Sequence, residues 1–266
     1  TLNPSSAASD VYKRQPYNAN FNSALSFDGN DYIETSGPNI TSGGFSFSGW
    51  FKTTNTSTQT IWTALDNTTQ KHFLRISNTQ FRLRLTDSTG ALLSVDNTLT
   101  TQDGNWHHVA FTTDGLTTTN GVVVYLDGVA LSNKGTLANN GLITTNKNNI
   151  GAYAATTWNF NGSLSNVSIF NTQLTPGNIT TLYNSGTPET SISHSPVSWW
   201  KLDAGGTTIT DYGSGGNDGT NNGATLVSSP VAVEQWVFTD SAGSNNGTST
   251  TPVSYTHLRA HETRIH

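Results

Sequence analysis

The chain has 266 residues, carries a formal net charge of −5 at pH 7 and contains no cysteine. The absence of cysteine excludes disulfides, zinc–thiolate sites and cysteine nucleophiles, and the mild negative charge without a basic patch argues against nucleic-acid binding through phosphate neutralisation. Charged residues make up only 11% and aromatic residues 10% of a chain rich in Thr, Asn, Ser and Gly, which is the composition of a turn-rich β protein.

The two ends differ from the rest of the chain. Residues 1–15 and 253–266 resemble translated sequencing-adaptor sequence, of the kind found at the ends of open reading frames assembled from metagenomic reads. The alternative is that each end is an ordinary flexible tail. We exclude both segments from the fold prediction.

From about Phe21 to Phe170 the sequence predicts short β-strands separated by turns. The first two predicted strands, Ala24–Gly29 and Asp31–Thr35, flank a Gly-Asn step that is typical of a hairpin turn. We therefore expect these two strands to form a hairpin.

Alternation of apolar and polar residues indicates strands along the rest of this region. In FSFSGWFKT the side chains of Phe45, Phe47 and Phe51 share one face, and in QFRLRLT the apolar residues face one way while Arg82 and Arg84 face the other. Turn signals recur about every 8 to 12 residues. This pattern predicts an all-β fold, an antiparallel β-sandwich.

One stretch, TPGNITTLYNSG, favours a helix instead of a strand. Thr175 is a suitable N-cap, Pro176 fits the first helical position, and Gly186 is suited to end the helix. We predict one short helix near residues 176–184.

A linker and two partial repeats follow the predicted sandwich domain of residues 16–186. Residues 187–196 are rich in Ser, Thr and Pro and form the expected linker. Residues 197–229 and 230–252 each contain an aromatic-rich strand, an Asp, a Gly-rich loop and an Asn/Asp-Gly-Thr step, a weak repeat of roughly 35 residues. The Gly-rich loop lacks the Gly-Lys-Ser/Thr end of a phosphate-binding loop, so we expect it to be a mobile surface loop.

Four segments carry a resemblance to a known family. ALSFDGNDYIE, FSFSGWFK, GNWHHVAFTTDG with VVVYLDGVAL, and GSLSNVSIFNTQLTPGNITTLYNSG resemble the laminin-G-like, or concanavalin A-like, jelly-roll superfamily in order and spacing over residues 21–186. The SWWKLD segment is similar to the strand that precedes ALSFDG in that family, but here it follows the domain. We expect Ser198–Asp203 to return across the linker and fill the edge that a missing first strand leaves unpaired.

The adjacent histidines of GNWHHVAFTTDG raise the question of a metal or catalytic site. Neighbouring residues of a strand point to opposite faces, so His107 and His108 cannot hold one metal ion together. His107 shares its face with Phe111, and His108 shares its face with Ala110. We interpret the stretch as a structural strand, with one histidine packed and the other half-exposed.

Hydrolysis deserves a test because the resemblance includes glucanases. The enzymes of that group place carboxylates in a Glu-x-Asp-x-Glu arrangement, which this sequence lacks. Its four glutamates are Glu34, Glu189, Glu234 and Glu262, and only Glu34 lies in the predicted sandwich. Asp31 and Glu34 are three residues apart and would point to opposite faces of a strand. We predict no catalytic residues, and a degenerate glycoside hydrolase is the disfavoured alternative.

Calcium is the metal that the resemblance implies, because laminin-G-like and pentraxin-like domains often bind Ca²⁺ at loops through Asp and backbone oxygens. Asp31, Asp114 and Asp127 lie at predicted strand ends or turns and are the candidate calcium ligands. The alternative is that all three serve Asp-Gly and Asn-Gly turns.

The resemblance favours a non-enzymatic recognition or adhesion module that binds carbohydrate or a cell-surface glycan. Sugar sites combine an aromatic face for stacking with amides for hydroxyl groups. The alternative at each candidate position is packing in the core or at its rim. The candidate ligand-binding residues are three aromatic residues expected on an exposed face, Trp62, Tyr153 and Trp158, and the asparagines Asn146, Asn148 and Asn149 of an Asn-rich loop.

The expected setting is a multidomain surface or virion protein, such as a phage tail or fibre component or a bacterial adhesin, with oligomeric assembly left open. This places the module outside the cell, on the cell surface or on a virion. No apolar run approaches the roughly 18 residues that span a bilayer, so we expect no membrane insertion. A structural spacer without a ligand is the alternative function.

Overall fold

The computed structural model describes residues 23–41, 43–115, 121–132, 141–155, 157–228, 236–238 and 247–249. The adaptor-like ends lie outside the described residues. The chain divides into two compact units, Thr1–Val227 and Ser228–His266. The second unit contains a two-stranded antiparallel sheet of β17 (Trp236–Phe238) and β18 (Gly247–Ser249).

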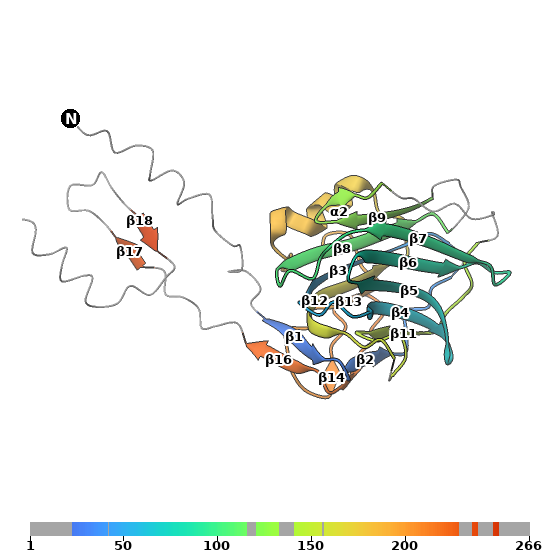
Figure 1. The fold of residues 1–266 in the computed structure, drawn as a ribbon, viewed down its shortest axis with the longest axis horizontal. Coiled ribbons are helices and arrows are strands. Elements are labelled where there is room, and N and C mark those ends of the chain that lie inside the picture. The colour runs from blue at the N-terminus through green and yellow to red at the C-terminus, as the bar shows by residue number, and fades with distance from the viewer. Residues whose placement is uncertain are drawn as a thin grey trace, which may run out of the picture. The chain divides into compact units, whose positions relative to one another are not determined.

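The first unit is the predicted all-β sandwich, built from two sheets (Figure 1). The first sheet has the order β10 (Val129–Ala130), β9 (Val122–Leu126), β8 (Trp106–Thr113), β3 (Phe45–Lys52), β12 (Asn161–Phe170), β1 (Ser23–Asp28) and β16 (Thr225–Ser228), and β13 (Ser198–Trp200) also pairs with β12. The second sheet has the order β14 (Thr208–Ile209), β15 (Gly219–Asn222), β2 (Tyr32–Thr35), β11 (Lys147–Ile150), β4 (Gln59–Asp66), β5 (Thr69–Ser77), β6 (Gln80–Thr86) and β7 (Leu92–Thr98).

Aromatic side chains from both sheets fill the core between them. As the alternation predicts, Phe45, Phe47 and Phe51 all face this core and are buried. The ring of Phe47 stacks on Phe111 of β8 at 5.6 Å and lies 5.4 Å from Trp62 of β4 in the opposite sheet. Contacts of this kind hold the two sheets together through buried apolar area.

The predicted hairpin of the first two strands is wrong. β1 and β2 lie in different sheets, β1 beside β12 and β2 between β15 and β11. The turn between them is closed by the Asp28 amide, which donates to Asp31 Oδ2 at 2.9 Å. Leu25 of β1 and Ile33 of β2 both enter the core. Burial of the apolar face of each strand therefore outweighs the local preference of the Gly-Asn step for a hairpin.

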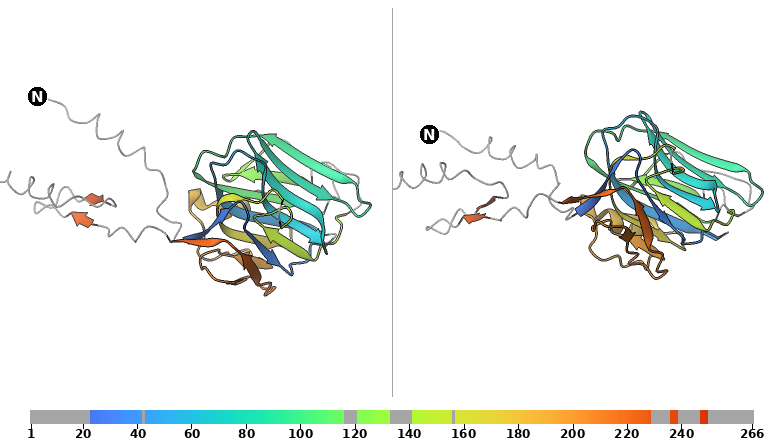
Figure 2. Two further views of the ribbon diagram at one scale, coloured as in Figure 1. Left: turned by 60° about the horizontal axis from the view of Figure 1, so that its bottom comes forward. Right: turned by 90° about the horizontal axis from the view of Figure 1, so that it is seen from below.

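The segment after the expected linker contributes strands to both sheets. β13 pairs with β12 in register Val167 to Trp200, and β15 pairs along the whole of β2. Figure 2 shows this orange to brown segment beside the blue strands β1 and β2. Trp200 is fully buried in the core. Ser198–Trp200 thus returns across the linker to pair with the first sheet, as expected from the sequence, and strands β13 to β16 belong to the sandwich.

The Gly-rich loop of this segment is organised around one carboxylate. Asp211 accepts hydrogen bonds from the backbone amides of Trp199 and Gly213 at 2.7 Å and of Asn217 at 2.8 Å. A Cβ atom on Gly213 would lie 2.5 Å from the Ser198 Cα, so only glycine fits where the loop crosses β13. The Gly-rich loop is thus tied to β13 by hydrogen bonds, while most of its residues lie at the surface, as expected.

The single α-helix of the described residues, α2 (Pro176–Tyr183), follows β12. Thr175 caps it as predicted: its hydroxyl accepts from the Asn178 backbone amide, and the Asn178 side-chain oxygen accepts from the Thr175 backbone amide. Asn184, at φ 44°, forms the left-handed C-cap that the sequence assigned to Gly186. No helix in the described part of the chain has the length and apolarity needed to cross a membrane.

Candidate functional site

The outer face of the second sheet, which points away from the core, carries an unusual group of side chains. In β5, Leu74 and Ile76 enter the core, so Phe73 and Arg75 lie on the outer face. Arg84 of β6 pairs with Phe73 across the strands. Its guanidinium lies 6.0 Å from the Phe73 ring centre, and that of Arg75 lies 5.2 Å from it.

Two aromatic residues of the loop between β11 and β12 complete this group. The Tyr153 ring meets Phe73 edge-on at 5.2 Å and lies 4.8 Å from the Trp158 ring. The guanidinium of Arg75 lies 4.6 Å from the centre of the Trp158 ring. We call Phe73, Arg75, Arg84, Tyr153 and Trp158 the aromatic–arginine cluster.

Trp158 is held in a conformation that a bulky residue rarely adopts. Its φ is +51°, in the left-handed region, where a large side chain is strained. The Trp158 carbonyl accepts from the Thr60 amide at 2.8 Å, which fixes this backbone geometry against β4. The side chain remains 41% exposed. The fold therefore holds a strained tryptophan at the surface, in contact with Arg75 and Tyr153 and still partly exposed.

Several buried polar atoms around the cluster have no hydrogen-bond partner. Asn149 of β11 pairs with Thr63 of β4, and Thr63 pairs with Phe73, so these residues adjoin the cluster on the same outer face. Buried polar groups are normally satisfied, and each unpaired one is destabilising. The unpartnered atoms on this face are Asn149 Oδ1, Thr60 Oγ1, Thr63 Oγ1 and Arg84 Nε.

Two of the predicted ligand-binding residues belong to the core instead. Trp62 is 0% exposed, and its Nε1 donates to Asn148 Oδ1 at 3.1 Å. Asn148 in turn donates to the Pro38 carbonyl. The prediction that Trp62 lies on an exposed face is wrong, because β4 alternates so that Trp62 points between the sheets. Asn148 is the buried partner of its indole nitrogen.

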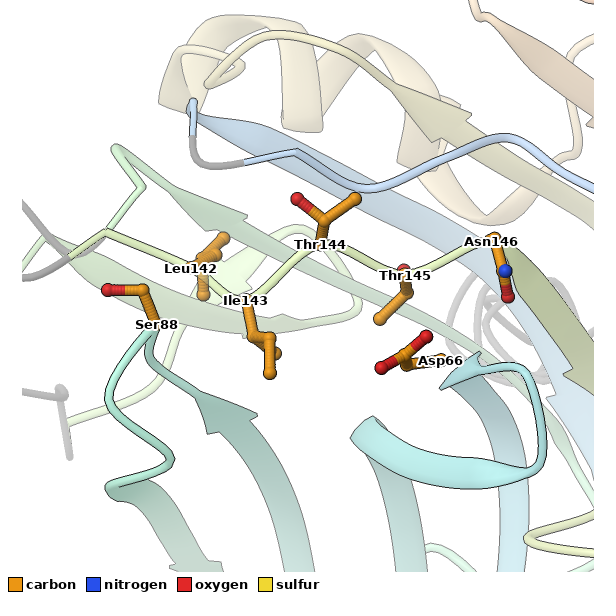
Figure 3. Close-up of a pocket in the computed structure, with 7 residues that line it drawn as sticks. All are labelled: Asp66, Ser88, Leu142, Ile143, Thr144, Thr145 and Asn146. Atoms are coloured by element: carbon orange, nitrogen blue, oxygen red, sulfur yellow. The ribbon is translucent and has the colours of Figure 1, made fainter.

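Asn146 lies apart from the aromatic–arginine cluster. Its amide exchanges hydrogen bonds with Asn67, at 2.8 Å to the Asn67 backbone and 3.1 Å to the side chain. It lines a cavity of about 500 Å³, in which Figure 3 shows Asp66 from the end of β4 below the chain segment that carries Leu142 to Asn146. Thr60 and Asp66 are near opposite ends of β4, roughly 20 Å apart. The remaining lining residues are Ser88, Leu142, Ile143, Thr144 and Thr145.

The structure thus brings together Tyr153, Trp158 and Asn149 and separates them from Asn146. The sequence prediction missed Phe73 and Arg75. The segment KHFLRIS could have indicated Phe73. The alternation that sends Leu74 inward puts this phenylalanine on the outer face, where a polar residue is usual.

The three candidate calcium ligands do not form a metal centre. Asp127 uses both carboxylate oxygens within the protein, accepting from the His108 amide and bonding His107 Nδ1, both at 2.8 Å. Asp31 accepts from the Asp28 amide, and the Asp114 amide donates to the Gly121 carbonyl. Within the described ranges, no group of three or more His, Cys, Asp or Glu side chains is arranged to hold a metal ion.

His107 and His108 point to opposite faces of β8, as predicted. His107 lies on the core side against Phe51, at its partly open end. His108 is fully buried on the other side, where its Nε2 lies 2.8 Å from Ser48 Oγ and its ring packs against Trp50 and Tyr183. Both histidines make contacts within the protein.

The side chain of His107 in β8 bonds the carboxylate of Asp127, which follows β9, and the strength of this interaction depends on pH. Burial lowers the pKa of His107, but the hydrogen bond and charge of Asp127, with those of Asp103, outweigh burial and raise this pKa above its ordinary value. Because the pKa of His107 is higher in the folded than in the unfolded chain, its protonated form stabilises the fold. This stabilisation is fully present below the pKa of the unfolded chain, near 6.5, and is lost as the pH rises through the pKa of the folded chain.

We therefore expect the His107→Gln variant to lose more stability at pH 5.5 than at pH 8.5, relative to the unchanged chain. Urea unfolding at the two pH values measures the difference. An equal loss at both values would mean that His107 contributes packing alone.

Comparison with known proteins agrees with this architecture. Residues 27–180, more than half of the chain, match the model of the concanavalin A-like lectin/glucanases superfamily. No curated protein sequence matches the chain.

Two solved structures share the fold at low sequence identity. A proposed carbohydrate-binding protein from Bacteroides ovatus superposes with a TM-score of 0.59 at 21% identity, over 79% of this chain and 60% of that protein. This chain therefore spans less than two thirds of that protein's length. A pentraxin from Limulus polyphemus superposes with a TM-score of 0.51 at 15% identity, over 69% of this chain and 93% of the pentraxin. With the family match over most of the sandwich, the chain belongs to the concanavalin A-like lectin/glucanases superfamily.

Proposed function

We propose that this chain is a non-enzymatic carbohydrate-recognition module and that the aromatic–arginine cluster is its binding surface. The observation that carries the proposal is Trp158, a strained and 41% exposed tryptophan held in place by Arg75, Tyr153 and Thr60. Aromatic faces bind the apolar face of a sugar ring, and a few fixed polar groups select its hydroxyl groups.

Asn149 and Thr63 supply such polar groups beside the aromatic rings. Their unpartnered oxygens lie under the cluster, so a small displacement of the loop that carries Tyr153 and Trp158 would expose them to ligand hydroxyl groups. Each bond formed would relieve a group that is unsatisfied in the free protein. The fold similarity to a proposed carbohydrate-binding protein supports the same ligand class.

The carboxylates on this face argue against hydrolysis. Glu34 of β2 pairs with Lys147 at 3.1 Å, and Asp96 of β7 pairs with Arg82 at 2.6 Å. These two strands are five positions apart in the sheet, which is roughly 24 Å at the usual strand spacing. Glycosidases need their two carboxyl groups within about 10 Å of each other.

The Trp158→Ala variant tests the binding surface. We expect it to weaken binding to the best ligand of a glycan array roughly ten-fold or more, because stacking area at the centre of the site is lost. Tyr212→Ala is the matched control, since Tyr212 is 52% exposed and contacts Trp199 and Lys201 outside the cluster. Affinity measured by calorimetry should be unchanged in that control.

Three outcomes would contradict this function. Failure of the unchanged chain to bind any glycan would favour the structural spacer. Unchanged affinity in Trp158→Ala would place the site elsewhere, and release of reducing sugar from β-glucans would favour a hydrolase.

We further propose that the module belongs to a larger extracellular protein, such as a phage tail or fibre component or a bacterial adhesin. The fold supports this proposal because it matches only 60% of the length of the Bacteroides ovatus protein. The full open reading frame would test it, since neighbouring domains distinguish a virion component from an adhesin.

A further inference from the structure

Three arginines lie next to one another on the outer face of the second sheet. Arg75 of β5 pairs directly opposite Arg82 of β6, and Arg84 follows on the same face of β6. Like charges in directly opposed positions destabilise a sheet. A nearby anion would offset this repulsion.

Among the described residues, the carboxylate of Asp96 forms a salt bridge with only one of the three arginines. Asp96 of β7 is the register partner of Arg82 and binds it in a bidentate pair, at 2.6 Å to Nε and 2.9 Å to Nη2. Neither Arg75 nor Arg84 forms a salt bridge with a described residue. Both guanidinium groups instead lie against the rings of Phe73 and Trp158.

The environment of Arg75 reflects this imbalance. Burial lowers the pKa of Arg75 below its ordinary value, and the charge of Arg82 lowers it further; the charge of Asp96 opposes this, and the charge of Arg84 adds a weaker lowering. The positive charge is thus partly desolvated and repelled by its neighbours. An anion placed between Arg75 and Arg84 would relieve both effects.

We propose that the aromatic–arginine cluster selects saccharides that carry an anionic group, a carboxylate or a sulfate. This inference rests on the proposed function and specifies its ligand class. The guanidinium of Arg75 lies over the Trp158 ring, 4.6 Å from its centre, so an anionic group on a saccharide bound at this tryptophan would be close to Arg75. The planar guanidinium donates paired hydrogen bonds to carboxylate and sulfate oxygens, and the rings that flank it limit competition from water.

Paired ligands that differ only in charge test the proposal. We would titrate the full chain at low ionic strength with an oligogalacturonate and with its methyl ester, and with a sulfated cello-oligosaccharide and its unsulfated parent. We expect at least one anionic member to bind roughly ten-fold or more tightly than its neutral partner. The preference should fall as salt is added. The two pairs distinguish a carboxylate from a sulfate.

Variants assign the preference to these residues. We expect the double variant Arg75→Gln, Arg84→Gln to bind the anionic and neutral members of the preferred pair equally. Lys201→Gln is the control for loss of a positive charge elsewhere on the protein, because Lys201 lies against Trp199 and Tyr212, outside the cluster. It should retain the preference.

The possible failures are distinguishable. Equal binding of charged and neutral partners by the unchanged chain would overturn the anionic preference and leave carbohydrate recognition standing. A preference that survives in the double variant would overturn its assignment to Arg75 and Arg84. Absence of binding to all four saccharides and to a glycan array would overturn both this inference and the proposed function.

Discussion

The free energy of unfolding of the Trp200→Ala variant should be about 3–5 kcal/mol lower than that of the unchanged chain, which is the usual effect of removing a buried tryptophan side chain. Trp200 is fully buried in the core, and its Nε1 donates to the Asn217 carbonyl at 2.9 Å. The substitution leaves a cavity between the sheets and an unpaired carbonyl in the loop that Asp211 organises. Urea unfolding followed by tryptophan fluorescence or circular dichroism measures the loss.

Trp158→Ala is the matched control for this prediction. The same side chain is removed, but Trp158 is 41% exposed and lies on the outer face. We expect less than half the loss of stability, because less apolar area is buried there. The two variants should therefore have different effects: Trp200→Ala mainly lowers stability, and Trp158→Ala mainly weakens binding. Equal small losses in both would mean that the segment after residue 196 is not part of the cooperative fold.

Acid should destabilise the sandwich through two buried histidines. Burial lowers the pKa of His72 to about 4, with smaller effects of a hydrogen bond to Ile143 and of the Lys71 charge. Burial likewise lowers the pKa of His108 to about 4, opposed only weakly by Asp127. His72 Nδ1 lies 3.1 Å from the Thr86 amide and accepts its hydrogen, so protonation there would also break a hydrogen bond.

The sign of the effect follows from proton uptake. Between pH 6.5 and pH 4 the unfolded chain binds protons at these two positions and the folded chain does not, so stability falls as the pH is lowered through this window. A shift from 6.5 to about 4 corresponds to about 3 kcal/mol for each histidine. This loss is a large part of the stability of an ordinary domain. The raised pKa of His107 acts in the opposite direction.

Urea unfolding from pH 7.5 down to pH 4 measures this dependence. The double variant His72→Gln, His108→Gln should be less stable at neutral pH but should lose less stability on acidification than the unchanged chain. The comparison separates the histidines from the carboxylates, which also contribute to acid unfolding. An identical slope in both proteins would assign the acid sensitivity to the carboxylates alone.

Local patterns in the sequence predicted many of the elements correctly. The alternation around Phe45, Phe47 and Phe51 identified the core face of β3, and Thr175 with Pro176 identified the start of α2. These features depend on neighbours within a few residues, so they can be read from a single chain. The same local reasoning failed at the first turn, because a Gly-Asn step is compatible both with a hairpin and with a crossing from one sheet to the other.

The candidate site was only partly accessible from the sequence. Tyr153 and Trp158 were identified as aromatic candidates, but Trp62 was placed on the wrong face. Phe73 and Arg75 were not identified, because their significance depends on the loop that folds over them. The charge imbalance also required the structure, since only the register of β5, β6 and β7 shows that Asp96 neutralises Arg82 and leaves Arg75 and Arg84 without a salt bridge.

By itself the sequence determined the class of this protein: an antiparallel β-sandwich with one short helix, adjacent histidines on opposite faces of a strand, and no motif for hydrolysis. Period-two alternation, turn residues and helix caps act locally, which is why these conclusions hold without a structure. Only the tertiary structure decided which segments pair and which side chains meet. Strand pairing depends on burial of faces far apart in the chain, so the sequence anticipated the return of Ser198–Asp203 but not the addition of β14 and β15 beside β2 in the second sheet. Trp158 meets Arg75 for the same reason, because a loop after β11 folds over β5.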